Sequence, residues 1–335
     1  MIRWLAVAWL ACSTAPPPAA IPAPPKASTS RDASWQLEEG PELVGLCDAS
    51  AGVWVGGSLY VADDERNVLH RFDGQGRPLG TVELAAAFPA LAGDKEADLE
   101  GATLASGTSW WIGSHDRGKG TEPRPSRQRL FAVDLDEGQA GSHRELHTTL
   151  LDALAAQAEL GPILATTAGN TSKAVDGFSI EGLATADDGL WLGLRAPVVD
   201  GRALMVPLAT AGDGLVAGSP VRLELGGRGI RALENLEDSL IIVAGPPADA
   251  GTFAVYRWDA TGTTPIEVSL RTLRPEGLVA TPDGLWLLSD DGGLERGGTP
   301  CKKLPAAQQR ARTAWLRPPA SAVATPGERG GPATP

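Results

Sequence analysis

Five equivalent positions, one in each of five repeated units, carry side chains that can do chemistry at a shared centre. Glu100, Glu181 and Glu276 are each followed by a glycine, and Ser50 and Arg231 stand at the same position in two further units. If these positions face one axis, the three carboxylates repel one another unless positive charge lies among them. A divalent cation held by carboxylate oxygens would supply that charge, with Ca²⁺ favoured. Arg231 and Arg195 would supply it equally well.

A second set of polar residues follows the second strand expected in each unit. It includes Asp63-Asp64, Ser114-His115, Arg195 and Asp290-Asp291. A histidine beside a carboxylate-lined mouth is a candidate general base, although a hydrogen-bonded structural role also fits His115. The aspartate pairs fit acids that form turns after strands equally well.

The candidate site therefore consists of two groups of residues. Glu100, Glu181, Glu276, Asp64 and Asp291 would hold the cation, while His115, Arg195 and Arg231 would be catalytic, with an arginine binding an anionic group. No nucleophile triad is visible, so water activated by the metal is the mechanism that these residues favour. The alternative is a salt-bridge network that joins the repeated units.

The elements that must position these residues are short hairpins. Residues 177–194 predict a strand, a tight turn at Asp188-Gly189 and a second strand, and the pattern recurs at 98–113 and 274–289. Five units of about four strands predict an all-β fold, a five-bladed β-propeller. Residues 147–160 predict a helical insertion, and a sixth, degenerate blade in the same region is the alternative. Residues 35–38 are expected to pair with the last unit and close the ring.

The chain resembles a known family in the order of its short motifs. These motifs extend over roughly residues 42–316 and include Lys95-Glu-Ala-Asp-Leu-Glu-Gly101, Trp111-Ile-Gly-Ser-His115, Ile180-Glu-Gly-Leu183, Pro275-Glu-Gly-Leu278 and Ser289-Asp-Asp-Gly292. They are similar to those of the domain of unknown function 3616 family. The shared Glu-Gly-Leu strand starts are also similar to esterase-like domains found near phytases. The resemblance implies a bacterial, often exported, propeller-like domain and no established activity.

The N-terminus of the chain predicts export. Residues 1–12 resemble a lipoprotein signal in which Cys12 becomes the lipidated residue; an ordinary signal peptide cut later and a misplaced start are the alternatives. Residues 13–33 predict a Pro/Ala-rich linker, 34–317 the propeller and 318–335 a disordered tail. In an exported protein, Cys47 and Cys301 favour a disulfide that joins the first and last units, against two free thiols.

The net charge of −12 argues against non-specific nucleic-acid binding. Together with the N-terminal signal, the sequence predicts an exported monomer that contacts the membrane only through its N-terminal lipid anchor. Its first functional interpretation is a cation-dependent hydrolase of esters or phosphoesters with its site at the central channel. The alternative is a non-catalytic envelope protein that binds a ligand or partner on the propeller face.

Overall fold

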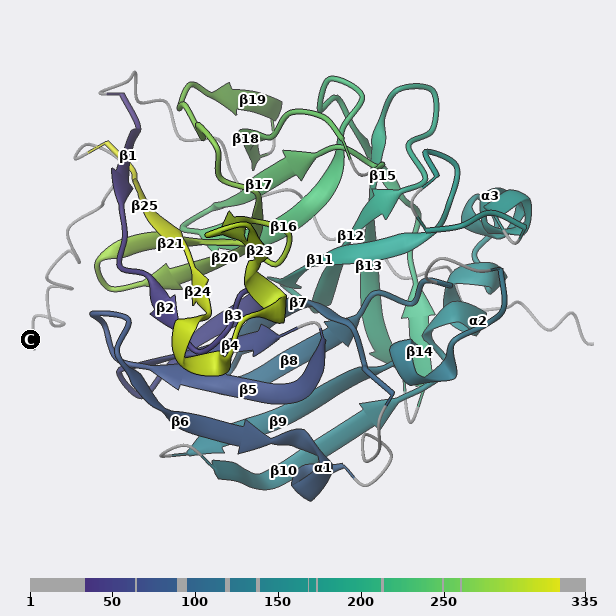
Figure 1. Ribbon diagram of the computed structural model, residues 1–335. Coiled ribbons are helices and arrows are strands. Elements are labelled where there is room, and N and C mark those ends of the chain that lie inside the picture. Colours follow the sequence, from purple (N-terminus) through teal and green to yellow (C-terminus); the bar gives the residue numbers. More distant parts are fainter. Residues whose placement is uncertain are drawn as a thin grey trace, which may run out of the picture.

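In the computed structural model, five antiparallel sheets surround a common centre (Figure 1). The structure describes residues 34–319 except 64, 89–94, 118–120, 137–138, 168, 173, 212–213, 249 and 260. Cys12, Asp64 and the expected signal and linker lie outside the described residues, as does most of the expected tail. The five sheets confirm the five-bladed β-propeller.

Four blades are formed by strands that follow one another along the chain, from the centre outwards. Their strands are β3 (Ala49–Val55), β4 (Ser58–Asp63), β5 (Arg66–Phe72) and β6 (Pro78–Glu83); β7 (Leu99–Ala105), β8 (Thr108–Gly113), β9 (Leu130–Asp136) and β10 (Gln139–His147); β11 (Ser179–Ala186), β12 (Gly189–Ala196), β13 (Ala203–Ala211) and β14 (Gly214–Ala217), with β15 (Val221–Leu223) also on β13; and β16 (Gly229–Leu236), β17 (Ser239–Gly245), β18 (Ala254–Asp259) and β19 (Gly262–Ile266).

The fifth blade joins the two ends of the propeller. Its inner strands are β20 (Pro275–Thr281) and β21 (Gly284–Ser289), followed by β25 (Thr313–Arg317) and the N-terminal β1 (Gln36–Glu39). β1 pairs antiparallel with β25, so the expected closure by residues 35–38 is confirmed. Closure removes the open sheet edges that the first and last blades would otherwise present.

Shorter elements reinforce this junction. β2 (Leu43–Val44) pairs with β24 (Arg310–Ala311), and β22 (Glu295–Arg296) pairs with β23 (Thr299–Pro300). The expected disulfide is confirmed: Cys47 and Cys301, at the start of the 3₁₀ helix η3 (Cys301–Lys303), are bonded with their Cα atoms 5.9 Å apart. Two further 3₁₀ helices are η2 (Pro125–Arg127) and η4 (Ala306–Gln308).

The insertion between the second and third blades is helical, so the alternative of a sixth blade is wrong. It contains two helices, α2 (Leu150–Ala156) and α3 (Leu160–Thr167), where a single helix was expected. The break follows from Gln157, whose Oε1 accepts hydrogen bonds from the backbone N–H groups of Glu159 and Leu160 at 2.7 and 2.8 Å and so starts a new helix. A one-turn helix, α1 (Leu84–Ala87), was not expected. Within the described part of the chain, no helix combines the length and the apolar character needed to cross a membrane.

Each inner strand carries a β-bulge at the same place. The register between the first and second strands of each blade shifts around one unpaired residue, and these residues are Ser50, Glu100, Glu181, Arg231 and Glu276. A bulge adds one residue to one strand and re-aims its side chain. The five positions singled out by the sequence are therefore structurally equivalent.

The glycine after a bulge glutamate allows the blades to pack closely near the axis. A Cβ atom on Gly182 would lie 2.8 Å from Leu233 Cγ and 2.9 Å from Ile230 Cγ2, both in the next blade. These distances are shorter than van der Waals contact, so only glycine fits without movement of a buried neighbour. The Glu-Gly-Leu motif thus combines a re-aimed acid, a close approach of backbones and a buried leucine.

Candidate functional site

A cavity of about 670 Å³ is lined by four of the five bulge residues. These are Glu100, Glu181, Arg231 and Glu276. The remaining lining side chains are mostly ionisable, and include Asp48, Glu65, Glu96, Asp98, Asp116, Arg124, Arg127, Arg195, Arg274, Asp290 and Lys302. The fifth bulge residue, Ser50, instead donates a hydrogen bond to the carbonyl oxygen of Leu99 and so ties the first blade to the second.

Arginine side chains stand between the carboxylates of this central cavity. Arg231 Nε lies 2.7 Å from Glu181 Oε2, and the same guanidinium is ion-paired with Glu276. Arg195 approaches the other oxygen of Glu181 at 2.8 Å and also donates to the carbonyl oxygen of Pro247 at 3.1 Å. Arg231 is buried; burial lowers the pKa of its guanidinium, and Glu181 opposes that shift. The bulge residues therefore form a salt-bridge network across three blades.

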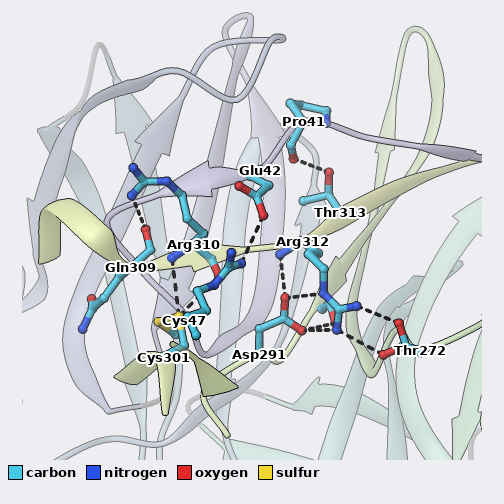
Figure 2. A network of polar contacts seen from close by, with 12 residues as sticks. Pro41, Glu42, Cys47, Thr272, Asp291, Cys301, Gln309, Arg310, Arg312 and Thr313 are labelled. Atoms are coloured by element: carbon cyan, nitrogen blue, oxygen red, sulfur yellow. Dashed lines mark hydrogen bonds and ion pairs between the residues drawn. A yellow bond between two sulfur atoms is a disulfide. The ribbon is translucent and has the colours of Figure 1, made fainter. Parts of the chain in front are cut away.

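Of the five expected metal ligands, the structure brings three, Glu100, Glu181 and Glu276, to the central cavity. Asp291 does not line the cavity: both of its carboxylate oxygens accept from the Arg312 guanidinium at 2.7 Å, and Oδ2 also accepts from the Arg312 backbone N–H (Figure 2). Asp64 lies outside the described residues. Because Arg231 already bridges Glu181 and Glu276, a divalent cation does not fit between these two carboxylates. Across the described ranges, no group of three or more His, Cys, Asp or Glu side chains is arranged to hold a metal ion.

A second charged cluster occupies the wall formed by the second blade. Arg127 Nη1 donates to Asp98 Oδ2 and Asp116 Oδ1, each at 2.6 Å, and its other terminal nitrogen pairs with Glu96. Burial raises the pKa of Asp98 to about 7; Arg127 opposes this rise, and Asp116 adds to it. Asp98 was not among the expected site residues, although the run of acids in motif 95–101 was a signal for it.

Two further carboxyl groups meet where the first and fifth blades join. Asp48 and Asp290 form a backbone bridge, and both line the central cavity. Burial raises the pKa of Asp48 to about 7, and the neighbouring charge of Asp290 adds to the rise while Lys302 opposes it. The Asp48 carboxyl group fits only because residue 292 is a glycine: a Cβ atom on Gly292 would lie 1.6 Å from Asp48 Oδ1. The central cavity thus contains two acids whose pKa values are raised to about 7 by burial.

His115 does not line the central cavity. It follows β8 with a positive φ of 57° and lies against α2 and α3, where it lines a different cavity. Its side chain is buried, and burial lowers its pKa to about 4. The next residue, Asp116, takes the position on the central cavity that was expected for His115. The structure therefore separates His115 from Arg195 and Arg231.

Solved structures with a similar fold come from proteins of several kinds. Glutaminyl cyclase from Myxococcus xanthus is 12% identical, with 84% of this chain and 96% of that chain covered and a TM-score of 0.45. The calcium-binding protein regucalcin from Agrobacterium tumefaciens is 12% identical, with 83% and 93% covered and a TM-score of 0.42. The PQQ-bound aldose sugar dehydrogenase from Streptomyces coelicolor is 13% identical, with 86% and 100% covered and a TM-score of 0.42. Identities and TM-scores this low support no inference about the activity of this chain.

No curated protein matches the sequence. The family model described as a protein of unknown function (DUF3616) matches residues 48–137 and 119–284, which together span most of the propeller. The chain therefore belongs to the DUF3616 family.

Proposed function

We propose that the central cavity binds a small, hydroxyl-rich molecule that carries an anionic group. The observation that supports this proposal is the convergence of four bulge residues on one cavity of about 670 Å³, a volume typical of small-molecule sites. Their ion pairs hold the side chains in place before a ligand arrives, which reduces the cost of ordering them on binding.

The charges of the cavity are distributed in a way that suits such a ligand. Exposed cations line it, among them Arg274 and Lys302, and these would meet the anionic group. Lys302 pairs with Glu65 at 2.5 Å, so this pair would open when the anion binds. Carboxylates that line the cavity, such as Asp290, accept hydrogen bonds and suit ligand hydroxyl groups.

Thermal unfolding with four probes tests this proposal. Glucose 6-phosphate and glucuronate should raise the melting temperature, whereas glucose and inorganic phosphate alone should raise it less. A ligand at 100 times its Kd adds about 2.7 kcal/mol to the stability of the folded state. Arg274→Ala should weaken the response, and Arg222→Ala, at an exposed position on β15, should not. If neither sugar anion raises the melting temperature, the proposed ligand class is wrong.

A second candidate function is hydrolysis of an ester or phosphoester in the same cavity. Asp48 and Asp98 favour it, because a carboxyl group with a pKa near 7 can donate a proton to a leaving group at neutral pH. A neighbouring carboxylate would then activate the attacking water. The hydrolysis needs no bound cation in this form, in contrast to the cation-dependent mechanism expected from the sequence.

Release of 4-nitrophenol from its acetate and phosphate esters distinguishes these mechanisms. We expect turnover in EDTA that falls at least tenfold in Asp98→Asn and in Asp48→Asn. Turnover that appears only when Ca²⁺ or another divalent cation is added would support the cation-dependent mechanism. Absence of turnover under all conditions, together with ligand-induced stabilisation, would support the non-catalytic binding function.

The proposed location is the cell envelope, with a lipid on Cys12 as the only membrane contact of a monomer. A disulfide such as Cys47–Cys301 persists in oxidising compartments, which supports export. Cell fractionation of the wild type and Cys12→Ser tests it: the wild type should sediment with membranes and the variant should not. Membrane association that is unchanged in Cys12→Ser, or a cytoplasmic wild-type protein, would contradict the proposal.

A further inference from the structure

A second cavity, of about 280 Å³, lies between the helical insertion and the second blade. Helices α2 and α3 contribute Leu151, Ala155 and Leu164, and Phe178 precedes β11. The buried side chain of His115 forms part of the wall. The cavity is therefore apolar over much of its surface, with an imidazole ring in one side.

The backbone determines which ring nitrogen of His115 carries the proton. Nδ1 lies 2.8 Å from the carbonyl oxygen of Gly113, and a carbonyl oxygen can only accept a hydrogen bond. Nδ1 must therefore be the protonated donor. In the neutral ring, which burial favours, Nε2 is then left as an acceptor.

No hydrogen-bond donor within the described part of the chain reaches His115 Nε2, although this atom is buried. A buried acceptor without a partner loses the hydrogen bond that it makes to water in the unfolded chain, so such atoms are rare and call for an explanation. Two other polar groups around the cavity already have partners: Thr167 Oγ1 donates to Leu164 O at 2.9 Å, and Asn170 Nδ2 donates to Asp176 O at 3.0 Å. The side chains of Arg117 and Gln128 also line the cavity. His115 Nε2 is thus an unpartnered acceptor on a residue that lines this cavity.

The second cavity is separate from the central one, although they share a loop. His115 lines the second cavity, whereas Asp116 lines the central cavity and accepts from Arg127. The positive φ of His115 turns the chain between these two residues. A ligand in the second cavity would therefore not compete directly with one in the central cavity.

We propose that this second cavity is a binding site for a small, largely apolar molecule with a single hydroxyl or N–H donor. The donor would bond to His115 Nε2, and the leucine and phenylalanine side chains would cover the apolar part. A phenol-sized ring suits the volume and supplies one donor. This site is independent of the function proposed for the central cavity.

Fluorine NMR with 4-fluorophenol and 4-fluoroanisole tests the proposal on the intact protein. The two probes have similar shapes, but the anisole lacks the O–H donor. We expect 4-fluorophenol to bind about tenfold or more tightly than 4-fluoroanisole, and His115→Asn to remove that difference. Asparagine tolerates the positive φ at this position, so the backbone turn is kept.

A variant that fills the second cavity tests whether the probe binds there. Leu164→Trp should abolish binding of 4-fluorophenol, whereas Val216→Trp, at an exposed position on β14, should leave it unchanged. Nitrogen NMR of labelled histidine adds a direct readout, because the Nε2 signal that is missing in His115→Asn should shift when 4-fluorophenol binds. Equal binding of the two probes, binding unaffected by Leu164→Trp, or an Nε2 signal that does not respond would each overturn the proposal. Absence of 4-fluorophenol binding would also overturn the proposal, and water would then be the occupant of the cavity.

Discussion

Arg231 Nε on β16 lies 2.7 Å from Glu181 Oε2 on β11, so bulge residues of two neighbouring blades are joined across the central cavity. The same arginine pairs with Glu276 on β20, in the blade on its other side. One cation thus links three blades at the place where the sequence suggested a metal ion.

Removal of this arginine should destabilise the fold strongly. Arg231→Met leaves two carboxylates without their shared partner, and breaking a buried ion pair costs about 3–5 kcal/mol. Urea unfolding at pH 7 should show a loss of that size, while Arg222→Met at an exposed position should have little effect. Equal stability of the two variants would mean that the network contributes nothing.

Divalent cations should not stabilise the protein. Arg231 occupies the space between Glu181 and Glu276, and Arg312 occupies both oxygens of Asp291. Melting temperatures after EDTA treatment, and after separate addition of Ca²⁺, Mg²⁺, Mn²⁺ or Zn²⁺, should therefore agree. A rise of several degrees with one ion would reinstate the metal site.

The blades approach closely at the glycine that follows a bulge residue, so a side chain added at that glycine should lower the free energy of unfolding. Gly182→Ala places a Cβ atom 2.8 Å from Leu233 Cγ, and overpacking of this kind costs about 1–3 kcal/mol. Gly169→Ala is the matched control, because nothing lies within 4 Å of a Cβ atom at that position. Chemical denaturation of the two variants should differ accordingly, and an unaffected Gly182→Ala would show that the blades can separate at no cost.

The raised pKa of Asp48 predicts that the protein becomes less stable as the pH rises. Its pKa is raised from 3.8 to about 7, chiefly by burial, so the folded state holds a proton that the unfolded state releases. This contribution to stability is fully present below pH 3.8 and is lost as the pH rises to about 7. Asp48→Asn should flatten the profile of unfolding free energy between pH 4.5 and 8 and stabilise the protein at pH 8. Asp283→Asn, in an exposed turn, should keep the wild-type slope, and a wild-type slope in Asp48→Asn would contradict the assignment.

The disulfide should contribute substantially, because it closes a long loop. Cys47 and Cys301 are 254 positions apart, and in the chain-entropy model a loop of this length gives roughly 5 kcal/mol as an upper figure. Cys47→Ala/Cys301→Ala should therefore unfold at a lower urea concentration than the oxidised wild type. Reduction of the wild type should move its transition toward that of the double variant, and coincident transitions for all three would refute the prediction.

Local patterns in the sequence determined the fold and the bulge positions. Alternating apolar residues, Gly-containing turns and the repeated Glu-Gly-Leu starts predict five blades, and residues 35–38 complete the last of them. These features depend on neighbours a few positions away, so they are visible in one sequence. Even the convergence of Glu100, Glu181 and Glu276 on one cavity follows from the equivalence of the repeats.

Only the tertiary structure decided the partner of each charge. Arg231 meets Glu181 and Glu276, and Arg312 meets Asp291, because the fold brings these residues together, which no spacing in the sequence reports. The sequence also does not show which way the His115 side chain points. In the structure His115 has a positive φ and lines the cavity beside α2 and α3, whereas Asp116 lines the central cavity. Two adjacent residues thus line two different cavities.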